Sequence, residues 1–258
     1  KVGNSFANIS GENAVSGGFL AALLAGFVAG YLVLGIKKLA DKLPESMEGI
    51  KPVLIYPLFG VLLIGVFMFA VNPTMAAINT GITSFLNSMG GSSKILLGCI
   101  VAGMMSIDMG GPFNKAAYVF GTASIASGNY DVMAAVMIGG MIPPLAVALA
   151  TTFFKKKFTS EERKSGVVNY IMGLCFITEG VIPFAAADPL RVIPSCVAGS
   201  AVAGGLSMLF GCTLRAPHGG IFVFPVVGNV VGYLIALAAG SLVGMLLLGV
   251  LKKDKVAE

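Results

Sequence analysis

The stretch GLCFITEGVIPFAAADPLRVIP, from Gly173 to Pro194, decides the fold. Most of its residues are apolar, yet it also carries Glu179, Asp188 and Arg191. A charged side chain at the centre of a membrane-inserting helix costs about 2.5–3.5 kcal/mol. These three side chains must therefore pair with one another, face water or bind a ligand.

The composition of the whole chain excludes an ordinary soluble domain. Of its 258 residues 56% are hydrophobic and only 11% are charged, whereas a soluble domain is typically about 25% charged. A helix needs about 20 apolar residues to span a bilayer. We therefore predict an all-α polytopic membrane protein, a bundle of several spans. The clearest apolar runs are Gly18–Leu34, Val53–Val71, Val132–Phe154 and Phe222–Leu251.

The net charge of +5 comes mainly from Lys and Arg residues in three groups, each beside an apolar run. This local clustering argues against nucleic acid as a partner and for the lipid bilayer. The positive-inside rule places such groups in the cytoplasm. We predict a multi-pass membrane protein whose loops near residues 37–51, 155–164 and 252–255 are cytoplasmic.

The first part of the chain predicts plain membrane spans. The polar start Lys1–Asn13 should lie outside, before an inward span from Ala14 to about Gly35. Pro52–Val71 should cross outward. The segment from Thr74 to about Asn87 has intermediate polarity, which predicts an interfacial amphipathic helix.

Two later apolar segments, Ile95–Ile107 and Gly166–Thr178, are too short for comfortable spans. All three lysine groups can lie in the cytoplasm only if Ile95–Tyr118 enters the membrane and returns to the same side. We predict two re-entrant hairpins, although four short crossings after residue 165 remain an alternative. The full spans of this part are predicted at Val132–Phe154, Pro189–Phe210 and Phe222–Leu251.

Three breaks in the apolar sequence combine Gly or Pro with ionisable residues. Their sequences are SIDMGGPFNKAAY (Ser106–Tyr118), ITEGVIPFAAADPLRVIP (Ile177–Pro194) and TLRAPHGGIFVFP (Thr213–Pro225). Interrupted helices leave backbone groups that are tolerated only inside protein or beside a water-filled cavity. Such segments indicate the binding site of a transporter.

The ionisable residues of the second and third breaks differ in their expected roles. Glu179, beside Thr178, has no basic residue within helical reach, so its carboxylate is expected to face a ligand, with a structural hydrogen bond as the alternative. His218 is the only histidine and lies in a broken segment. Asp188 and Arg191 lie one helical turn apart and can form an ion pair.

The polar groups together suit a polyol, because sugar hydroxyls need both donors and acceptors. Asn114 and Lys115 of the first break add an amide and an amine, and Asp108 a further carboxylate. Lys115 and Arg215 can instead extend to the membrane interface. The residues alone thus indicate a transporter of a small polar solute.

Neither a metal site nor a disulfide framework is expected. No HExxH pattern and no clustered Cys/His set occurs. The four cysteines are scattered through apolar sequence and are expected to be small buried side chains. They are Cys99, Cys175, Cys196 and Cys212.

The motifs MGGPFNKAAY, ITEGVIPFAAADPLRVIPS and LRAPHGGIFV resemble the fructose-specific enzyme II C-domain of the bacterial phosphoenolpyruvate:sugar phosphotransferase system. The resemblance covers nearly the whole chain after Gly18. It implies a permease that carries fructose across the cytoplasmic membrane without a cofactor. It further implies that fructose becomes fructose 1-phosphate, with the phosphoryl group supplied by a phosphocysteine on a B-domain, which an A-domain serves upstream.

The same resemblance implies an architecture. Residues 1–90 would form a scaffold that holds a homodimer together, and residues 91–258 a transport part with two re-entrant hairpins that moves in an elevator-like way. An early scaffold helix of the family is not seen, so the chain is expected to be truncated at its start.

The resemblance also implies roles for residues of the breaks. A hairpin glutamate that binds a sugar hydroxyl corresponds to Glu179, which is the predicted catalytic residue, and His218 is its predicted neighbour. The predicted sugar-binding residues are Glu179, His218, Asn114, Lys115, Asp108, Thr178, Arg191 and Asp188.

Three other functions remain open. An ion-coupled secondary transporter could use Glu179 or Asp108 to bind its coupling ion. A membrane scaffold or receptor could keep the charges paired for structural reasons. A mannitol-type permease of the same system would share the chemistry of the fructose permease.

Overall fold

The computed structural model describes residues 18–88 and 91–254. The predicted polar start and the first residues of the first span, from Ala14, lie outside the described residues. The chain divides into two compact units, an N-terminal unit (Lys1–Asn87) and a C-terminal unit (Ser88–Glu258).

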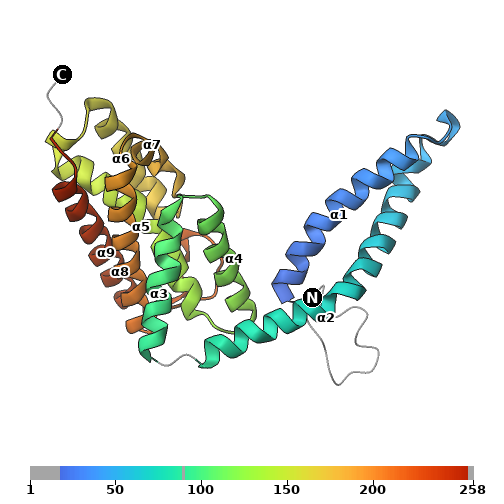
Figure 1. Cartoon of the computed structure of the whole chain (residues 1–258), viewed down its shortest axis with the longest axis horizontal. Coiled ribbons are helices and arrows are strands. Elements are labelled where there is room, and N and C mark those ends of the chain that lie inside the picture. The colour runs from blue at the N-terminus through green and yellow to red at the C-terminus, as the bar shows by residue number, and fades with distance from the viewer. Residues whose placement is uncertain (1–17, 89–90, 255–258) are drawn as a thin grey trace. The chain divides into compact units, whose positions relative to one another are not determined.

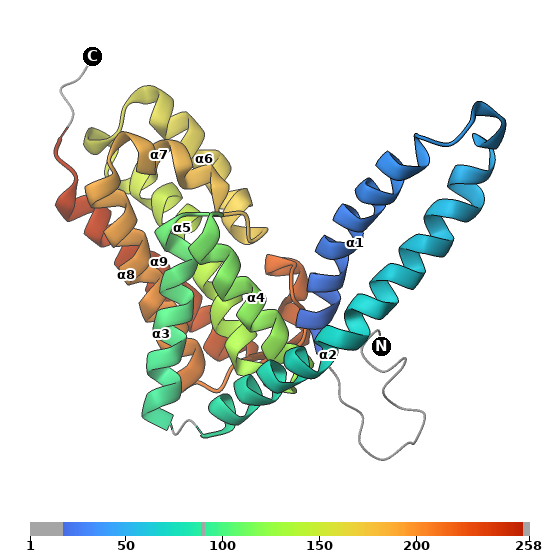
Figure 2. The same ribbon diagram turned by 45° about the vertical axis from the view of Figure 1, so that its right-hand side comes forward.

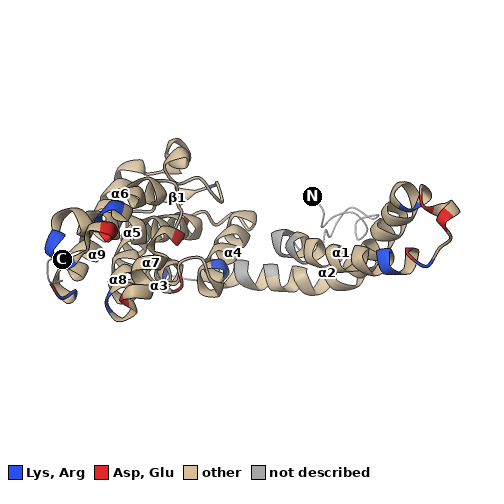
Figure 3. Cartoon of the chain, turned by 90° about the horizontal axis from the view of Figure 1, so that it is seen from above, with Lys and Arg blue, Asp and Glu red and all other residues tan. Residues whose placement is uncertain are grey.

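From residue 18 onward, the N-terminal unit consists of two long helices and a short charged connection. Helix α1 (Gly18–Ala40) ends with Lys37 and Lys38 in its last turn, where positive charge is favourable beside the exposed carbonyl groups. The connection contains η2 (Glu45–Met47) and η3 (Lys51–Ile55). Charged positions of both signs gather there (Figure 3).

Helix α2 (Tyr56–Ser88) corrects one prediction. We expected a span that ends near Val71 and a separate interfacial helix from Thr74, but α2 continues through both with Pro73 inside it. A proline within a helix removes one hydrogen bond and bends the helix without having to end it. The axis of α2 changes direction along its length (Figure 1).

The C-terminal unit is built around helix α5 (Asp131–Phe153), which carries no charge after its first residue and is buried along nearly its whole length. Five helices of the unit pack against α5, and one of them, α4, also packs against α3. These helices are α3 (Gly91–Ile107), α4 (Pro112–Ala126), α6 (Ser160–Leu174), α8 (Pro189–Leu209) and α9 (Val230–Leu251).

Small residues allow these helices to approach closely. A β-carbon at Gly139 of α5 would lie 2.5 Å from the Cα of Ala102 in α3, so only glycine fits there. Pro143 has no backbone N–H, so the carbonyl of Gly139, one turn earlier, lacks its usual helical donor. The Ser200 hydroxyl donates to that carbonyl instead, at 2.9 Å. Close packing and side-chain hydrogen bonds of this kind hold helices together in lipid.

Each of the three predicted breaks is an irregular segment between helices of this unit. The first is the turn between α3 and α4, which run side by side in opposite directions in both views (Figures 1 and 2). The second follows α6 and contains η5 (Glu179–Val181) and α7 (Ile182–Ala187). The third joins α8 to α9 through β1 (Thr213–Leu214), η6 (Gly220–Val226) and β2 (Val227–Gly228).

One expected span is shorter than its apolar run. Phe222–Leu251 does not form a single helix, because α9 begins only at Val230. Asn229 adopts a left-handed conformation with φ of 58°, and its side chain accepts a hydrogen bond from the Gly232 N–H. This N-cap satisfies a free donor at the helix start and fixes the boundary.

Four described helical segments are long and apolar enough to cross a membrane: Lys51–Ile78, Asp131–Phe153, Pro189–Leu209 and Val230–Leu251. Gly91–Ile107 is a shorter apolar helix. The prediction of an all-α chain with several membrane-span helices is therefore confirmed. That the hairpins are re-entrant remains a prediction.

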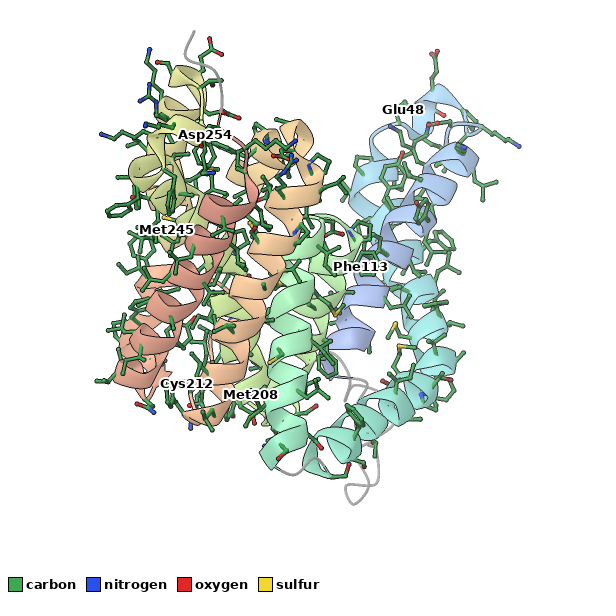
Figure 4. The ribbon with its side chains drawn as sticks, turned by 60° about the vertical axis from the view of Figure 1, so that its left-hand side comes forward. Glu48, Phe113, Met208, Cys212, Met245 and Asp254 are labelled. Atoms are coloured by element: carbon green, nitrogen blue, oxygen red, sulfur yellow. The ribbon has the colours of Figure 1, made fainter. Side chains whose placement is uncertain are left out.

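The C-terminal unit has two ends of different composition. One, called here the lysine end, carries η4 (Lys155–Lys157) and the residues after α9, including Asp254. The other end carries the ion pair between Lys94 and Asp131. Figure 4 shows Asp254 at one end of the bundle and Met208 and Cys212 at the other.

Candidate functional site

The three breaks meet beside the middle of α5. A β-carbon on Gly140 of that helix would overlap the ring of Phe176, which precedes η5. A β-carbon on Gly110, in the α3–α4 turn, would lie 2.8 Å from the Glu179 Oε1. A β-carbon on Gly220, at the start of η6, would overlap the Leu174 carbonyl oxygen at the end of α6. Three segments far apart in sequence thus share one site.

Asp108 shapes the first break. Its two carboxylate oxygens accept the backbone N–H groups of Phe113, at 2.6 Å, and Asn114, at 3.0 Å. These N–H groups lie in the first turn of α4, where no partner exists within the helix. Met109 and Gly110 have positive φ angles, which bring the chain round sharply. Asp108 therefore caps α4 and presents Gly110 to Glu179.

The other predicted residues of the first break lie on α4. The Asn114 side chain is buried, and its Nδ2 donates to the Met105 carbonyl at 2.7 Å, which ties α4 to the end of α3. Lys115 is exposed one residue further along α4. The structure thus uses the Asn114 amide to hold the turn and leaves the Lys115 amine accessible.

Glu179 is the first residue of η5 and is exposed, with its carboxylate directed at the Gly110 turn. Thr178 is buried, and its hydroxyl lies 3.5 Å from the Glu179 Oε2. At that distance the bond is weak, so the carboxylate keeps capacity to accept hydrogen bonds from a ligand.

His218 belongs to the third break and packs on Phe176, the residue before the second break. Its ring centroid lies 5.3 Å from that of Phe176, with an angle of 75° between the planes. The Phe176 ring also lies 6.3 Å from that of Tyr118 on α4. Three rings, called here the aromatic trio, thus lie together: Tyr118 of α4, Phe176 just before the second break and His218 of the third break.

Asp188 and Arg191 lie elsewhere, at the lysine end. Arg191 Nη1 is 3.0 Å from Asp188 Oδ1, so the predicted ion pair is confirmed. The Nζ of Lys252, which is almost fully buried, lies 3.7 Å from Asp188 Oδ2 and 4.8 Å above the Phe158 ring. The structure thus pairs Asp188 with Arg191 and Lys252, and that Asp188 and Arg191 bind the sugar remains a prediction.

Arg215 is also held away from the site. Its guanidinium lies 4.8 Å from the centre of the Tyr130 ring, a cation–π contact between the third break and the residue before α5. Among residues 18–88 and 91–254, no group of three or more His, Cys, Asp or Glu side chains could hold a metal ion.

Sequence reasoning did not select Gly110, Tyr118, Phe176 or Asn169 as site residues. Gly110 and Tyr118 lie inside the motif MGGPFNKAAY, and Phe176 lies in the stretch Gly173–Pro194, directly before the motif that begins at Ile177. Their places in or beside the motifs were a usable signal. Asn169 is a single amide in the apolar run VVNYIM of α6, and its importance is visible only from its contacts.

The fold and the site define a class. The chain is a polytopic α-helical membrane protein whose interrupted helices carry a carboxylate, Glu179, and an imidazole, His218. Residues 1–199 match the model of the family described as phosphotransferase system, EIIC, and the chain belongs to that family. The resemblance inferred from the three breaks is therefore confirmed at the level of the family.

Several curated proteins are similar to this chain over most of its length. It is 53% identical over 237 residues to the fructose-specific EIIABC component of Bacillus subtilis (strain 168), which covers 92% of this chain and 37% of that protein. It is also 53% identical over 237 residues to the fructose permease IIC component of Bacillus amyloliquefaciens, covering 92% of this chain and 78% of the relative.

A third relative is the fructose-specific EIIB'BC component of Escherichia coli (strain K12), 48% identical over 219 residues, with 83% of this chain and 39% of the relative covered. The chain thus spans well under half the length of two of these relatives. Among solved structures there is no significant match.

Proposed function

We propose that this chain is the membrane part of a fructose-specific enzyme II, which carries fructose across the cytoplasmic membrane and presents it for phosphorylation to fructose 1-phosphate. The observation that carries the proposal is the Glu179 carboxylate, exposed at the tip of one broken helix and facing the Gly110 turn of another. The names of the similar proteins, which are fructose-specific components or a fructose permease, support the substrate.

In the proposed reaction Glu179 accepts a hydrogen bond from the fructose C1 hydroxyl. A carboxylate within about 3 Å can act as a general base. The hydroxyl oxygen attacks the phosphorus of a phosphocysteine on the B-domain, the P–S bond breaks and the cysteine leaves as a thiolate. The hydroxyl proton passes to Glu179 and then to water. Positioning contributes most of the catalysis in phosphoryl transfer, and the Lys115 amine is available to offset charge on the phosphoryl oxygens.

The aromatic trio supplies a second kind of contact. The rings of Phe176 and Tyr118 offer apolar surface to the C–H groups of a sugar, and His218 adds an imidazole that can donate or accept. The chain has no Trp, so these rings are the proposed substitutes for the indole that often stacks on sugars. Thr178 and Asn114 complete the proposed site by holding the two turns.

The proposed membrane topology follows from the lysine groups. The lysine end faces the cytoplasm, so the α3–α4 hairpin enters from the outside and the α6–α7 hairpin from the cytoplasm. The two tips meet partway across, and we propose that both hairpins are re-entrant. The ion cluster of Asp188, Arg191 and Lys252 then lies on the cytoplasmic side, where the phosphorylated B-domain must approach.

We also propose partners. The relatives named EIIABC and EIIB'BC components carry further domains, which supports a fused or separate B-domain and an A-domain as partners. The N-terminal unit is the proposed scaffold of a homodimer, because α1 and α2 expose large apolar side chains, which need lipid or another copy to cover them. The C-terminal unit is the proposed moving part.

The test is the substitution Glu179→Gln, which removes the charge and keeps the shape. Fructose phosphorylation should be abolished in proteoliposomes supplied with phosphorylated B-domain, while the protein stays inserted. Glu161→Gln, an exposed glutamate in the first turn of α6, is the matched control and should be fully active. Undiminished phosphorylation by Glu179→Gln would rule out the catalytic role.

The same assay separates the other functions. Labelled fructose, mannitol and glucose are compared with and without the phosphoryl donor. The proposal expects donor-dependent uptake that is fastest with fructose. Uptake that needs an ion gradient and no donor would instead establish a secondary transporter, and preferred uptake of mannitol would establish the mannitol type.

A further inference from the structure

Asn169 is a buried amide directly behind the tip that carries Glu179. It lies on α6, and only 1% of its surface is exposed. Neither Oδ1 nor Nδ2 has a hydrogen-bond partner within the part of the chain that the structure describes. Buried polar groups are normally paired, so an amide with both ends unpaired requires an explanation.

The amide lies against the residue that follows Glu179. A β-carbon on Gly180 would overlap the Asn169 Oδ1 and the Met172 Sδ. No side chain therefore separates the Asn169 amide from the backbone of the tip. Gly180 allows this contact, since any other residue would push the tip away from α6.

The tip itself has hydrogen-bond donors that need acceptors. The N–H groups at the start of a helix have no partner within it, and the N-cap residue Thr178 makes no side-chain hydrogen bond to the start of η5. The Thr178 hydroxyl is instead oriented to the Glu179 carboxylate. The backbone that begins η5 and an unpaired amide oxygen thus lie at the same place.

We propose that Asn169 is a positioning residue for Glu179, and that its amide pairs with the backbone N–H groups of the tip when fructose occupies the site. This inference rests on the proposed function. A small shift of η5 toward α6 would bring the Gly180 or Glu179 N–H to Oδ1. Because Glu179 belongs to the same turn, its carboxylate would be held in one orientation toward the C1 hydroxyl.

A buried amide that serves only stability is normally hydrogen-bonded. In this arrangement of the tip the Asn169 amide has no partner among the described residues, so pairing is gained only when the tip moves relative to α6. A ligand that favours the paired arrangement shifts the population toward it.

The test combines stability with fructose binding. Asn169→Leu has a similar shape and removes the unpaired amide, so its unfolding temperature without fructose should equal or exceed that of the wild type. Its kcat/KM for fructose phosphorylation should nevertheless fall about tenfold or more. The matched control is Ser241→Ala in α9, away from the three breaks. It removes a buried hydroxyl that, like the Asn169 amide, has no hydrogen-bond partner in the described residues. This variant should keep full activity.

A double-substitution cycle shows whether Asn169 acts through Glu179. In a Glu179→Gln background, Asn169→Leu should cause little further loss of fructose affinity, because the effects of residues that act as a unit are not additive. The inference about Asn169, but not the proposed function, would be overturned by either of two results. One is an equal loss of fructose affinity on Asn169→Leu in the wild-type and Glu179→Gln backgrounds. The other is a kcat/KM of Asn169→Leu within twofold of the wild-type value. A wild-type protein that does not phosphorylate fructose would overturn the proposed function as well.

Discussion

Replacement of Gly110 by alanine isolates the contact between the first and second breaks. The added β-carbon would lie 2.8 Å from the Glu179 Oε1 and 3.3 Å from its Cδ and Cγ. Either the carboxylate swings away or the α3–α4 turn retreats. In both cases the geometry in which Glu179 meets the sugar is lost.

Two terms set the size of the effect of Gly110→Ala. The backbone at Gly110 has φ of 119°, a region that costs a residue with a side chain about 1–3 kcal/mol in folding free energy. A hydrogen bond to a charged group contributes about 1.5–3 kcal/mol. Its loss from the transition state lowers kcat/KM about 10- to 150-fold, at 1.36 kcal/mol for each factor of ten.

A matched control separates these terms. Gly128, between α4 and α5, has φ of 81°, and a β-carbon there would meet no atom within 4 Å. Gly128→Ala should therefore lose stability through backbone strain and keep its kcat/KM. Both variants are measured by thermal unfolding and by donor-dependent phosphorylation of fructose. Equal kcat/KM values for Gly110→Ala and Gly128→Ala would refute the reasoning that Gly110 makes room for Glu179.

Three further outcomes are expected. Asp188→Asn leaves two cations without their partner and should lower the free energy of unfolding by about 1.5–3 kcal/mol; adding Lys252→Met should restore part of the loss, and no recovery would contradict the ion cluster. Ser200→Ala leaves a buried carbonyl of α5 without its donor and should cost about 1–3 kcal/mol by thermal unfolding, so an unchanged midpoint would argue against that bond. In a background without other reactive cysteines, Lys156→Cys should react with an impermeant thiol reagent only from the cytoplasmic side and Ala126→Cys only from the outside; the reverse pattern would invert the proposed topology.

The boundaries of the helices show how far local sequence can be used. The apolar runs predicted the long helices, because hydropathy is a property of consecutive residues. The same runs failed where one polar or cyclic residue decided the outcome. Pro73 bends α2 without ending it. Asn229 caps α9, which begins at Val230, eight residues after Phe222, the first apolar residue of its run. Whether α2 continues past Pro73, and where α9 begins, depends on whether the freed backbone groups find hydrogen-bond partners.

Within the site, the sequence alone identified Glu179 and His218 as polar groups in broken helices, predicted the Asp188–Arg191 pair from helical spacing, and carried the motifs that reveal the family. The tertiary structure decided which groups meet. It turned Asp108 into a helix cap, placed the ion pair beside Lys252 and set Gly110 against Glu179. The physical reason is that charge, hydropathy and helical spacing are local, whereas contacts between segments far apart in the chain arise only when close-packed helices set their depth and direction.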